Sequence, residues 1–301
     1  MKIGYPCINR SIGCQSTHTF RLKSYSNKRL IETVEQNLTC LFKILQFNAR
    51  RDLLFFRITS DLVPFASHQI NKFKWQKHFR RNFEKIGKFI RDHNMRISMH
   101  PDQFTLINSL DLDIFKRSIA ELQYHAEVLD LMNLDTTAKI QIHVGGVYRE
   151  KENSMRRFVS RYRKIGKTLR RRLVIENDDK SYTVKDCLRI HDDTGIPVLF
   201  DTFHHEVHNN GEAVIDCLRK TRKTWQVNDG IPMIDYSHQR DGSPKGAHAE
   251  TINTRRFKNF LEISKPNDFD VMLEIKDKER SALKAVRIAH NDTRFQPEIV
   301  R

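Results

Sequence analysis

Eight short apolar segments recur along the 301-residue chain, and their spacing constrains the fold more than any other feature. In chain order they read KIGYP, LLFFRI, RISMH, KIQIH, RLVIE, PVLFD, IPMID and DVMLE. From Tyr5 to Glu274, successive segment ends lie 25 to 53 residues apart, which fits repeated βα units. An open doubly wound sheet would need a glycine-rich phosphate turn near its start, and GYPCINRSIG is not one.

Residues with helical spacing occupy the intervals between these segments. One apolar helix face runs from Ile31 to Leu45, a second from Trp75 to Ile90 and a third from Phe115 to Leu129. Shorter helices are expected at 149–166, 183–193, 212–219, 254–263 and 279–289. The sequence therefore predicts a single (β/α)8 TIM barrel over residues 1–290, followed by a loosely packed C-terminal tail at 291–301.

Six of the eight segments end on a side chain that can bind a metal ion. These residues are His100, His143, Glu176, Asp201, Asp235 and Glu274. His204, in DTFHH, and His248, in KGAHAE, follow two of the later segments. Parallel strands of a barrel all end on one rim, so we expect the eight side chains to converge there. Imidazoles and carboxylates without thiolates suit manganese or zinc, and eight ligands suffice for two or three ions, with Glu176 as the bridging carboxylate.

The net charge indicates the kind of partner, and the cysteine content indicates the cellular compartment. The formal net charge is +16, which favours a polyanionic partner such as nucleic acid. The five cysteines show no paired spacing, so we expect reduced thiols and an intracellular protein, in the cytoplasm or nucleoid. Every apolar run is shorter than the roughly 18 residues that a membrane span needs, so no membrane association is expected.

Seven motifs occur in the order found in a known family. They are GYPC at 4–7, FRITSDLVPFASH at 56–68, SMHPDQF at 98–104, IENDD at 175–179, DTFHH at 201–205, GAHA at 246–249 and VMLEIKDKE at 271–279. Together they resemble the UV damage endonuclease family, which is similar in fold to barrel-type apurinic-site endonucleases. The resemblance runs from about residue 3 to residue 279, nearly the whole chain.

The resemblance implies a metal-dependent DNA-repair enzyme that nicks duplex DNA 5′ to ultraviolet photoproducts, both cyclobutane dimers and 6-4 photoproducts, and leaves a 3′ hydroxyl and a 5′ phosphate. It implies three metal positions, usually with manganese, and Glu176 as a catalytic residue. The first position would use His100, His143 and Glu176, the second Glu176, Asp201, Asp235 and Glu274, and the third His204 and His248.

The same resemblance assigns DNA contacts. Gln103 and Phe104 match a pair that inserts into the helix opposite the lesion, while Tyr5 and Asn9 match loop positions that contact the damaged strand. A monomer is expected, because the rim must accommodate bulky DNA.

Three residues depart from the family pattern. Met233 stands where a lysine is common, Asp235 where histidine is expected and Phe104 where tyrosine is frequent. The first change weakens the expected third metal position, the second adds negative charge, and the third keeps stacking but removes a hydroxyl.

Other functions share parts of this pattern. An apurinic-site endonuclease, or an enzyme acting on both lesions, would use the same ligands. A metal-dependent sugar isomerase also carries metals on a barrel rim, but its small substrate leaves the charge of +16 unexplained. A non-enzymatic nucleic-acid-binding protein with structural metals is disfavoured, because structural sites tend to be closed.

Overall fold

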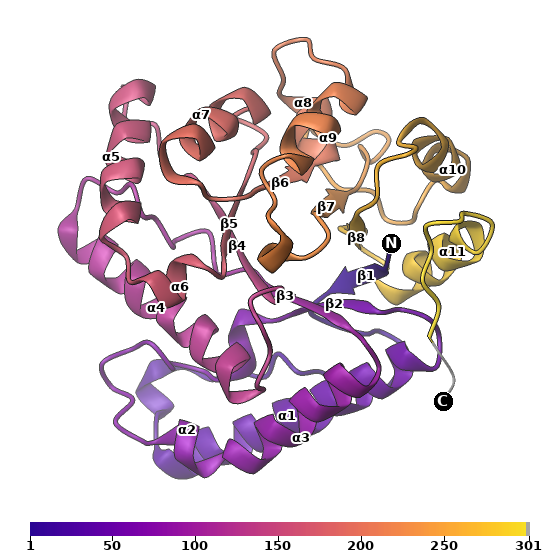
Figure 1. Cartoon of the computed structure of the whole chain (residues 1–301). Coiled ribbons are helices and arrows are strands. Elements are labelled where there is room, and N and C mark those ends of the chain that lie inside the picture. Colours follow the sequence, from indigo (N-terminus) through magenta and orange to yellow (C-terminus); the bar gives the residue numbers. More distant parts are fainter. Residues whose placement is uncertain (299–301) are drawn as a thin grey trace.

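Eight parallel strands close into a barrel in the computed structural model, which describes residues 1–298 (Figure 1). Each strand pairs with its neighbours in chain order, and β1 pairs with β8 to complete the ring. The strands are β1 (Ile3–Pro6), β2 (Phe55–Ile58), β3 (Arg96–Met99), β4 (Lys139–His143), β5 (Leu173–Glu176), β6 (Val198–Asp201), β7 (Met233–Tyr236) and β8 (Asp270–Leu273). The predicted (β/α)8 barrel is confirmed.

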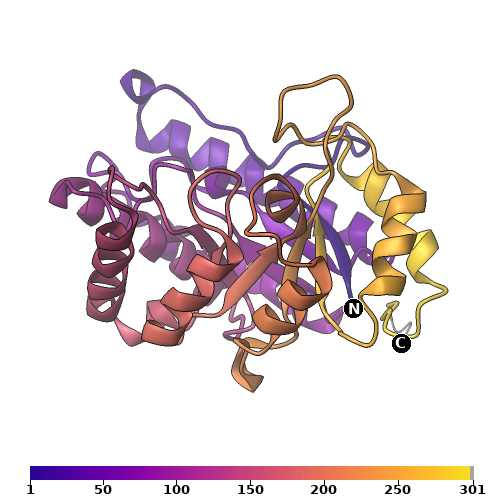
Figure 2. The ribbon, with the colours of Figure 1, turned by 90° about the horizontal axis from the view of Figure 1, so that it is seen from above.

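Helices surround the barrel, and Figure 2 shows the strands enclosed among them. They are α1 (Asn27–Ala49), α2 (Trp75–His78), α3 (Arg80–Asp92), α4 (Leu112–Leu131), α5 (Lys151–Lys164), α6 (Lys167–Arg170), α7 (Val184–Thr194), α8 (Thr202–Val207), α9 (Val214–Arg222), α10 (Thr254–Ile263) and α11 (Glu279–Ala289). Short 3-10 turns lie at Leu22–Ser24, Ser60–Leu62 and Val227–Asp229.

One expected helix is divided in two. The apolar spacing from Trp75 to Ile90 predicts a continuous helix, but Phe79 (φ −97°, ψ 10°) separates α2 from α3. Trp75, Phe79 and Phe83 are all buried, so they remain on one apolar face despite the break. Periodicity identifies the buried face, whereas the backbone break leaves no mark in that pattern.

The barrel interior is built in layers along the strand direction. Phe55, Val174, Leu199, Met233 and Met272 form a buried apolar cluster together with Trp225. Side chains alternate between the two faces of a strand, so the residue two positions later points the same way. At those positions, one layer closer to the strand ends, stand Arg57, Glu176, Asp201, Asp235 and Glu274.

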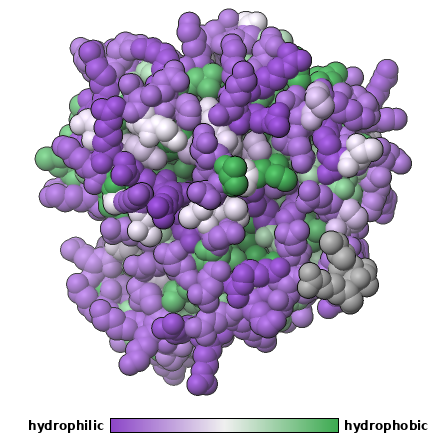
Figure 3. Space-filling view, in the orientation of Figure 1, coloured by the Kyte–Doolittle hydropathy of each residue, from purple (hydrophilic) through white to green (hydrophobic). Residues whose placement is uncertain are grey.

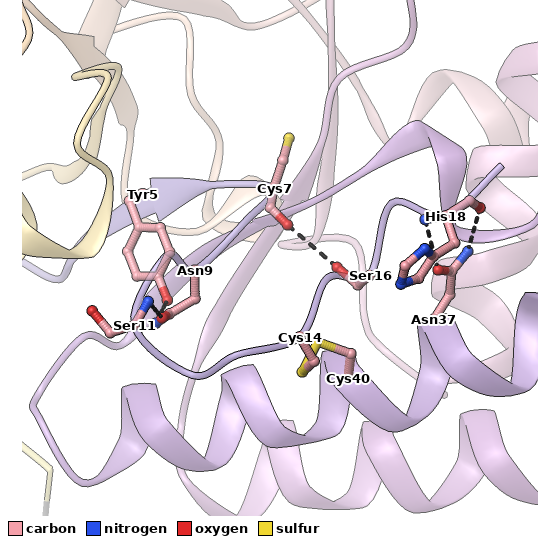
Figure 4. Close-up of a disulfide and its surroundings, with 9 residues drawn as sticks. All are labelled: Tyr5, Cys7, Asn9, Ser11, Cys14, Ser16, His18, Asn37 and Cys40. Carbon is pink, nitrogen blue, oxygen red and sulfur yellow. Dashed lines mark hydrogen bonds between the residues drawn. A yellow bond between two sulfur atoms is a disulfide. The ribbon is translucent and has the colours of Figure 1, made fainter.

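The expectation that all five cysteines are reduced is wrong. Cys14 and Cys40 form a disulfide that ties the loop after β1 to α1 (Figure 4), so not all cysteines are reduced. The separation of 26 residues hides this contact, because the loop must fold back across α1 before the two sulfur atoms meet. Cys7, Cys187 and Cys217 are free thiols.

The start of the tail is held firmly. The Arg294 guanidinium donates to the carbonyls of Asn267 and Leu261 at 2.6 and 2.7 Å. The Gln296 amide donates to the carbonyl of Met1 at 3.0 Å. The described part of the predicted tail is therefore tied to the barrel at Arg294 and Gln296, and the rest, 299–301, lies outside the described residues.

The surface is mainly hydrophilic, as expected for a chain in which 30% of the residues are charged. Hydrophilic residues dominate the face shown in Figure 3, and hydrophobic ones occur there in small groups. Within the described part of the chain, no helix combines the length and apolar composition needed to cross a bilayer.

Candidate metal centre at the barrel mouth

Glu176 lies between two histidines where β3, β4 and β5 end. Its Oε1 is 3.1 Å from Nε2 of His100 and 2.9 Å from Nε2 of His143. Pairing of β4 with β5 sets His143 directly beside Glu176. The carboxylate itself is only 1% exposed. Consecutive strands thus bring together the first three predicted ligands.

Three further acids gather across the barrel mouth. Atoms of Asp201, Asp235 and Glu274 all lie within 4.8 Å of one another. The register pairs Asp201 with Asp235, so adjacent parallel strands end on neighbouring carboxylates. Oδ1 of Asp201 also accepts the amides of Phe203 and His204, each at 2.7 Å, and so caps α8. Its second oxygen remains directed to the cluster.

The two later histidines complete the group. His204 Nδ1 lies 3.3 Å from Asp201 Oδ2, and His248 Nε2 lies 3.9 Å from Glu274 Oε2. The rings of His204 and His248 are 6.1 Å apart, and those of His143 and His204 are 6.2 Å apart. All eight predicted metal ligands therefore occupy one connected cluster.

Three imidazoles are oriented in the way that metal ligands are. In each of them Nδ1 faces a backbone carbonyl. His100 faces the carbonyl of Pro101 at 2.9 Å, His204 faces that of Asn177 at 3.0 Å, and His248 faces that of Glu274 at 2.9 Å. A carbonyl oxygen can only accept, so Nδ1 carries the hydrogen and Nε2 keeps a lone pair in the neutral ring. Such partners fix the ring of a metal-binding histidine. The donor set therefore fits divalent cations.

Burial and crowding of charge shift the pKa values of the histidines. Burial lowers the pKa of His143, but the Glu176 carboxylate outweighs it and raises the pKa to about 9. Burial also lowers the pKa of His204, but the carboxylates of Asp201, Glu176 and Glu274 outweigh it and raise the pKa to about 10. These rings hold protons where a cation would otherwise supply the charge.

The carboxyl groups divide according to their neighbours. Burial raises the pKa of Glu176 less than His143 and His100 lower it, so it lies well below its ordinary value. Burial raises the pKa of Asp201 to about 6, against the pull of His204. Burial and neighbouring acids also raise the pKa of Asp235 well above its ordinary value, with Arg57 opposing. Four close carboxylates thus need more positive charge than the described side chains bring.

Arg57 and Gln141 belong to this cluster, and the sequence reasoning missed both. Arg57 Nη2 lies 2.8 Å from both oxygens of Asp235, and Nη1 contacts Glu274. The Gln141 amide donates to Asp235 at 2.6 Å and also contacts Glu176. A signal was available: each is a polar residue inside an apolar segment, and Gln141 precedes His143 by the two residues that keep a side chain on one face.

The loop after β3 carries Gln103 and Phe104, the predicted wedge that inserts into the DNA helix opposite the lesion. Gln103 is exposed, and Phe104 is 72% exposed although it is a large aromatic residue. Thr105, Ile107, Asn108 and Ser109, which follow, are buried. The loop therefore has an exposed tip on a buried base.

Side chains from α5 and the loop after β4 fix that base. Arg161 donates to the carbonyl of Ile107 at 2.9 Å, and Arg157 donates to the carbonyl of Asn108 at 2.6 Å. Gly145 (φ 111°) allows a close approach, because a Cβ there would lie 2.3 Å from Oδ1 of Asn108. The positive charges of Arg157 and Arg161 are thus structural.

Three other residues singled out by the family pattern lie inside the protein. Tyr5 is fully buried, and its hydroxyl donates to Asn48 at 2.6 Å. The same hydroxyl accepts from Asn9 at 2.8 Å (Figure 4). Asn9 is 3% exposed. Neither side chain presents surface to DNA in this conformation. Met233 is buried in the apolar cluster beneath the rim, away from the layer of ligands.

A second group of possible ligands lies at α8 and α9. Atoms of His205, Glu212 and Cys217 come within 4.8 Å of one another. However, Nε2 of His205 faces the carbonyl of Glu212 at 2.9 Å, and the Glu212 carboxylate accepts the amide of Asn210 at 2.9 Å. Burial raises the pKa of the Cys217 thiol to about 12. These bonds hold the loop between the helices and leave the thiol neutral.

Known proteins share this fold and sequence. A family model described as UV-endonuclease UvdE matches residues 1–296. The UV DNA damage endonuclease of Clostridium perfringens (strain 13 / Type A) is 37% identical over 288 residues, which are 95% of this chain and 70% of that protein. The crystal structure of SacUVDE is similar with a TM-score of 0.92 and 45% identity, covering 96% of this chain and 98% of that one. Endonuclease IV from Thermus thermophilus, at 13% identity and a TM-score of 0.57, shares the fold over 83% of this chain and 93% of its own.

Proposed function

The chain belongs to the UV-endonuclease UvdE family, and from this premise we propose that it cuts duplex DNA on the 5′ side of ultraviolet photoproducts. The substrates would be cyclobutane dimers and 6-4 photoproducts, and the products a 3′ hydroxyl and a 5′ phosphate. The observation that carries the proposal is the cluster of eight imidazole and carboxylate ligands at the barrel mouth.

The cluster would hold two or three divalent cations, with manganese as the expected metal and zinc as the alternative. His100, His143 and Glu176 would hold one, and the acids of β6 and β8 with His204 and His248 another. Bound there, such ions lower the pKa of water and neutralise charge on a phosphodiester undergoing displacement. Glu176 belongs to the first set, and the Gln141 amide contacts both Glu176 and Asp235, so we assign Glu176 as the bridging and catalytic residue.

The chain's own residues would orient the DNA. A photoproduct weakens stacking, so its nucleotides are extruded at lower cost than normal ones. Phe104 and Gln103, at the tip of a loop with a buried base, would fill the vacated space. Tyr5 and Asn9, buried behind the loop after β1, would act on DNA only indirectly, by holding that loop.

The charge of +16 supports duplex DNA as the partner, since basic side chains bind phosphates in a salt-dependent manner. It also disfavours a small uncharged sugar as substrate. We propose that one copy of the chain suffices for incision, because all eight ligands come from a single barrel.

Matched duplexes test the proposal. Three end-labelled duplexes of one sequence would carry a single cyclobutane dimer, a single abasic site or no lesion, and each would be incubated with metal-free protein plus Mn²⁺, Zn²⁺ or a chelator. We expect a nick 5′ to the dimer that a polymerase can extend, and none with the chelator. Incision of the abasic duplex alone would reassign the chain as an apurinic-site endonuclease, and incision of both would indicate dual specificity. Undiminished cleavage in the chelator would overturn the metal-dependent account.

A further inference from the structure

Arg57 places a fixed positive charge inside the candidate metal centre. It lies on β2, is 3% exposed, and occupies the same interior layer as the four carboxylates. Its Nη2 contacts both oxygens of Asp235 at 2.8 Å and Oε1 of Gln141 at 2.7 Å, while Nη1 contacts Oε1 of Glu274. The guanidinium is therefore held by residues of β4 and β7 and by Glu274, which directly follows β8.

These contacts occupy three of the acceptor positions of Asp235. A carboxylate offers about four lone-pair positions. Arg57 approaches both oxygens, and the Gln141 amide donates to Oδ2 at 2.6 Å. A divalent ion bound to Asp235 would also sit beside a like charge, which is unfavourable in a buried site. Asp235 is thus occupied by the protein's own cation.

The other ligands of the cluster remain available. Oε2 of Glu274 faces His248, and Oδ2 of Asp201 faces His204, both without contact to the guanidinium. His100 and His143 converge on Oε1 of Glu176. Among these ligands in the described part of the chain, Glu274 pairs with Arg57 through Oε1, whereas Glu176 and Asp201 pair with no Lys or Arg side chain.

We propose that Arg57 takes the place of one metal ion: it pairs with both oxygens of Asp235 and with one oxygen of Glu274, so that the rim binds two divalent cations and Asp235 is not a ligand. This inference rests on the proposed metal-dependent function and corrects the ligand set expected from the sequence. With four ionised carboxylates and Arg57, two divalent ions bring the cluster to a charge of +1, which one phosphodiester neutralises. Three ions would leave a charge of +3. Arg57 is on this account a positioning residue that sets the number of ions.

Metal stoichiometry tests the inference apart from activity. Metal-free protein would be titrated with Mn²⁺, with free Mn²⁺ followed by electron paramagnetic resonance and bound metal by elemental analysis. We expect two ions per wild-type chain. Arg57→Met releases Asp235 and should add a third ion or tighten the weaker of the two sites at least tenfold. Arg96→Met is the matched control, because Arg96 is also buried and pairs with the barrel acid Asp270 at 3.5 Å, at the opposite ends of the strands; it should bind two ions as wild type does.

A second variant keeps the test decisive if Arg57→Met fails to fold. Asp235→Asn preserves shape and removes one carboxylate, and we expect it to bind two ions with affinities within about threefold of wild type. Loss of an ion in Asp235→Asn, or three ions in the wild-type chain, would overturn the role of Arg57 while leaving metal dependence intact. A wild-type chain that takes up no ion would overturn this inference together with the proposed function.

Discussion

Phe104→Ala should weaken recognition of a photoproduct without weakening the fold. The ring is 72% exposed, so its removal sacrifices little buried area, and a surface change of this kind alters the free energy of unfolding by less than about 0.5 kcal/mol. Stacking of an aromatic side chain on a base is worth roughly 1–3 kcal/mol. At 1.4 kcal/mol per factor of ten, affinity for the damaged duplex should fall about 5- to 150-fold.

The assay compares two variants on two duplexes. Leu112→Ala is the matched control, because Leu112 is 62% exposed at the start of α4 and is not part of the predicted wedge. Fluorescence anisotropy would give affinities for a dimer-containing duplex and its undamaged counterpart, and thermal unfolding would give stability. We expect loss of affinity for damaged DNA only, and only in Phe104→Ala. Equal affinities for the damaged duplex in Phe104→Ala, Leu112→Ala and wild type would refute the wedge.

Other parts of the molecule give three further predictions. Glu176→Gln should lower the incision rate by at least ~10²–10³-fold with DNA affinity retained, and a rate within tenfold of wild type would remove Glu176 from the chemistry. The raised pKa values of His143 (about 9) and His204 (about 10) mean that Mn²⁺ must displace protons, so calorimetry in two buffers should show proton release near pH 7.5 and affinity that rises with pH. Because both pKa values are higher in the folded state than in the unfolded one, the metal-free protein should lose stability as pH rises from about 6.5 through 10. No proton release would contradict this. Cys14→Ser opens a link spanning 26 residues and should lower the free energy of unfolding by about 3.5 kcal/mol in non-reducing buffer, and an unchanged denaturation midpoint would show that the disulfide does not form.

The fold was predictable because its signal is local and repeated. Every strand except β7 lies within its predicted apolar segment, and β7 runs one residue past it, to Tyr236. The strand β4 begins and ends where expected, at Lys139 and His143. Short runs that are buried on both faces are typical of parallel sheets covered by helices. The break at Phe79 was not predictable, since the residues on both sides keep the spacing of one apolar face.

The site was predictable only where topology alone brings residues together. Polar residues at the ends of parallel strands must share a rim, so the convergence of His143, Glu176 and Asp201 follows from the fold. Which side chain pairs with which depends on distances that the sequence does not contain. Asp235 pairs with Arg57, which lies 178 residues away in the sequence, and the spacing of the apolar segments does not indicate this pair.

The burial of Tyr5 was also not predictable from the sequence. Tyr5 was expected to contact DNA, yet β1 directs its hydroxyl toward Asn48 on α1. The sequence marks Tyr5 as the end of an apolar segment, but the side that it faces depends on how α1 packs against the barrel. Contacts between distant elements therefore set the limit of the sequence-based prediction.

One measurement tests most directly whether the rim is a metal centre. Crystals grown with Mn²⁺ would be used to calculate an anomalous difference map at the manganese absorption edge. We expect strong peaks inside the barrel mouth, one bonded to Glu176 and the paired histidines His100 and His143, and one bonded to Glu274 and Asp201. A mouth without such peaks, or manganese found only on the outer helices, would mean that the rim is not a metal centre.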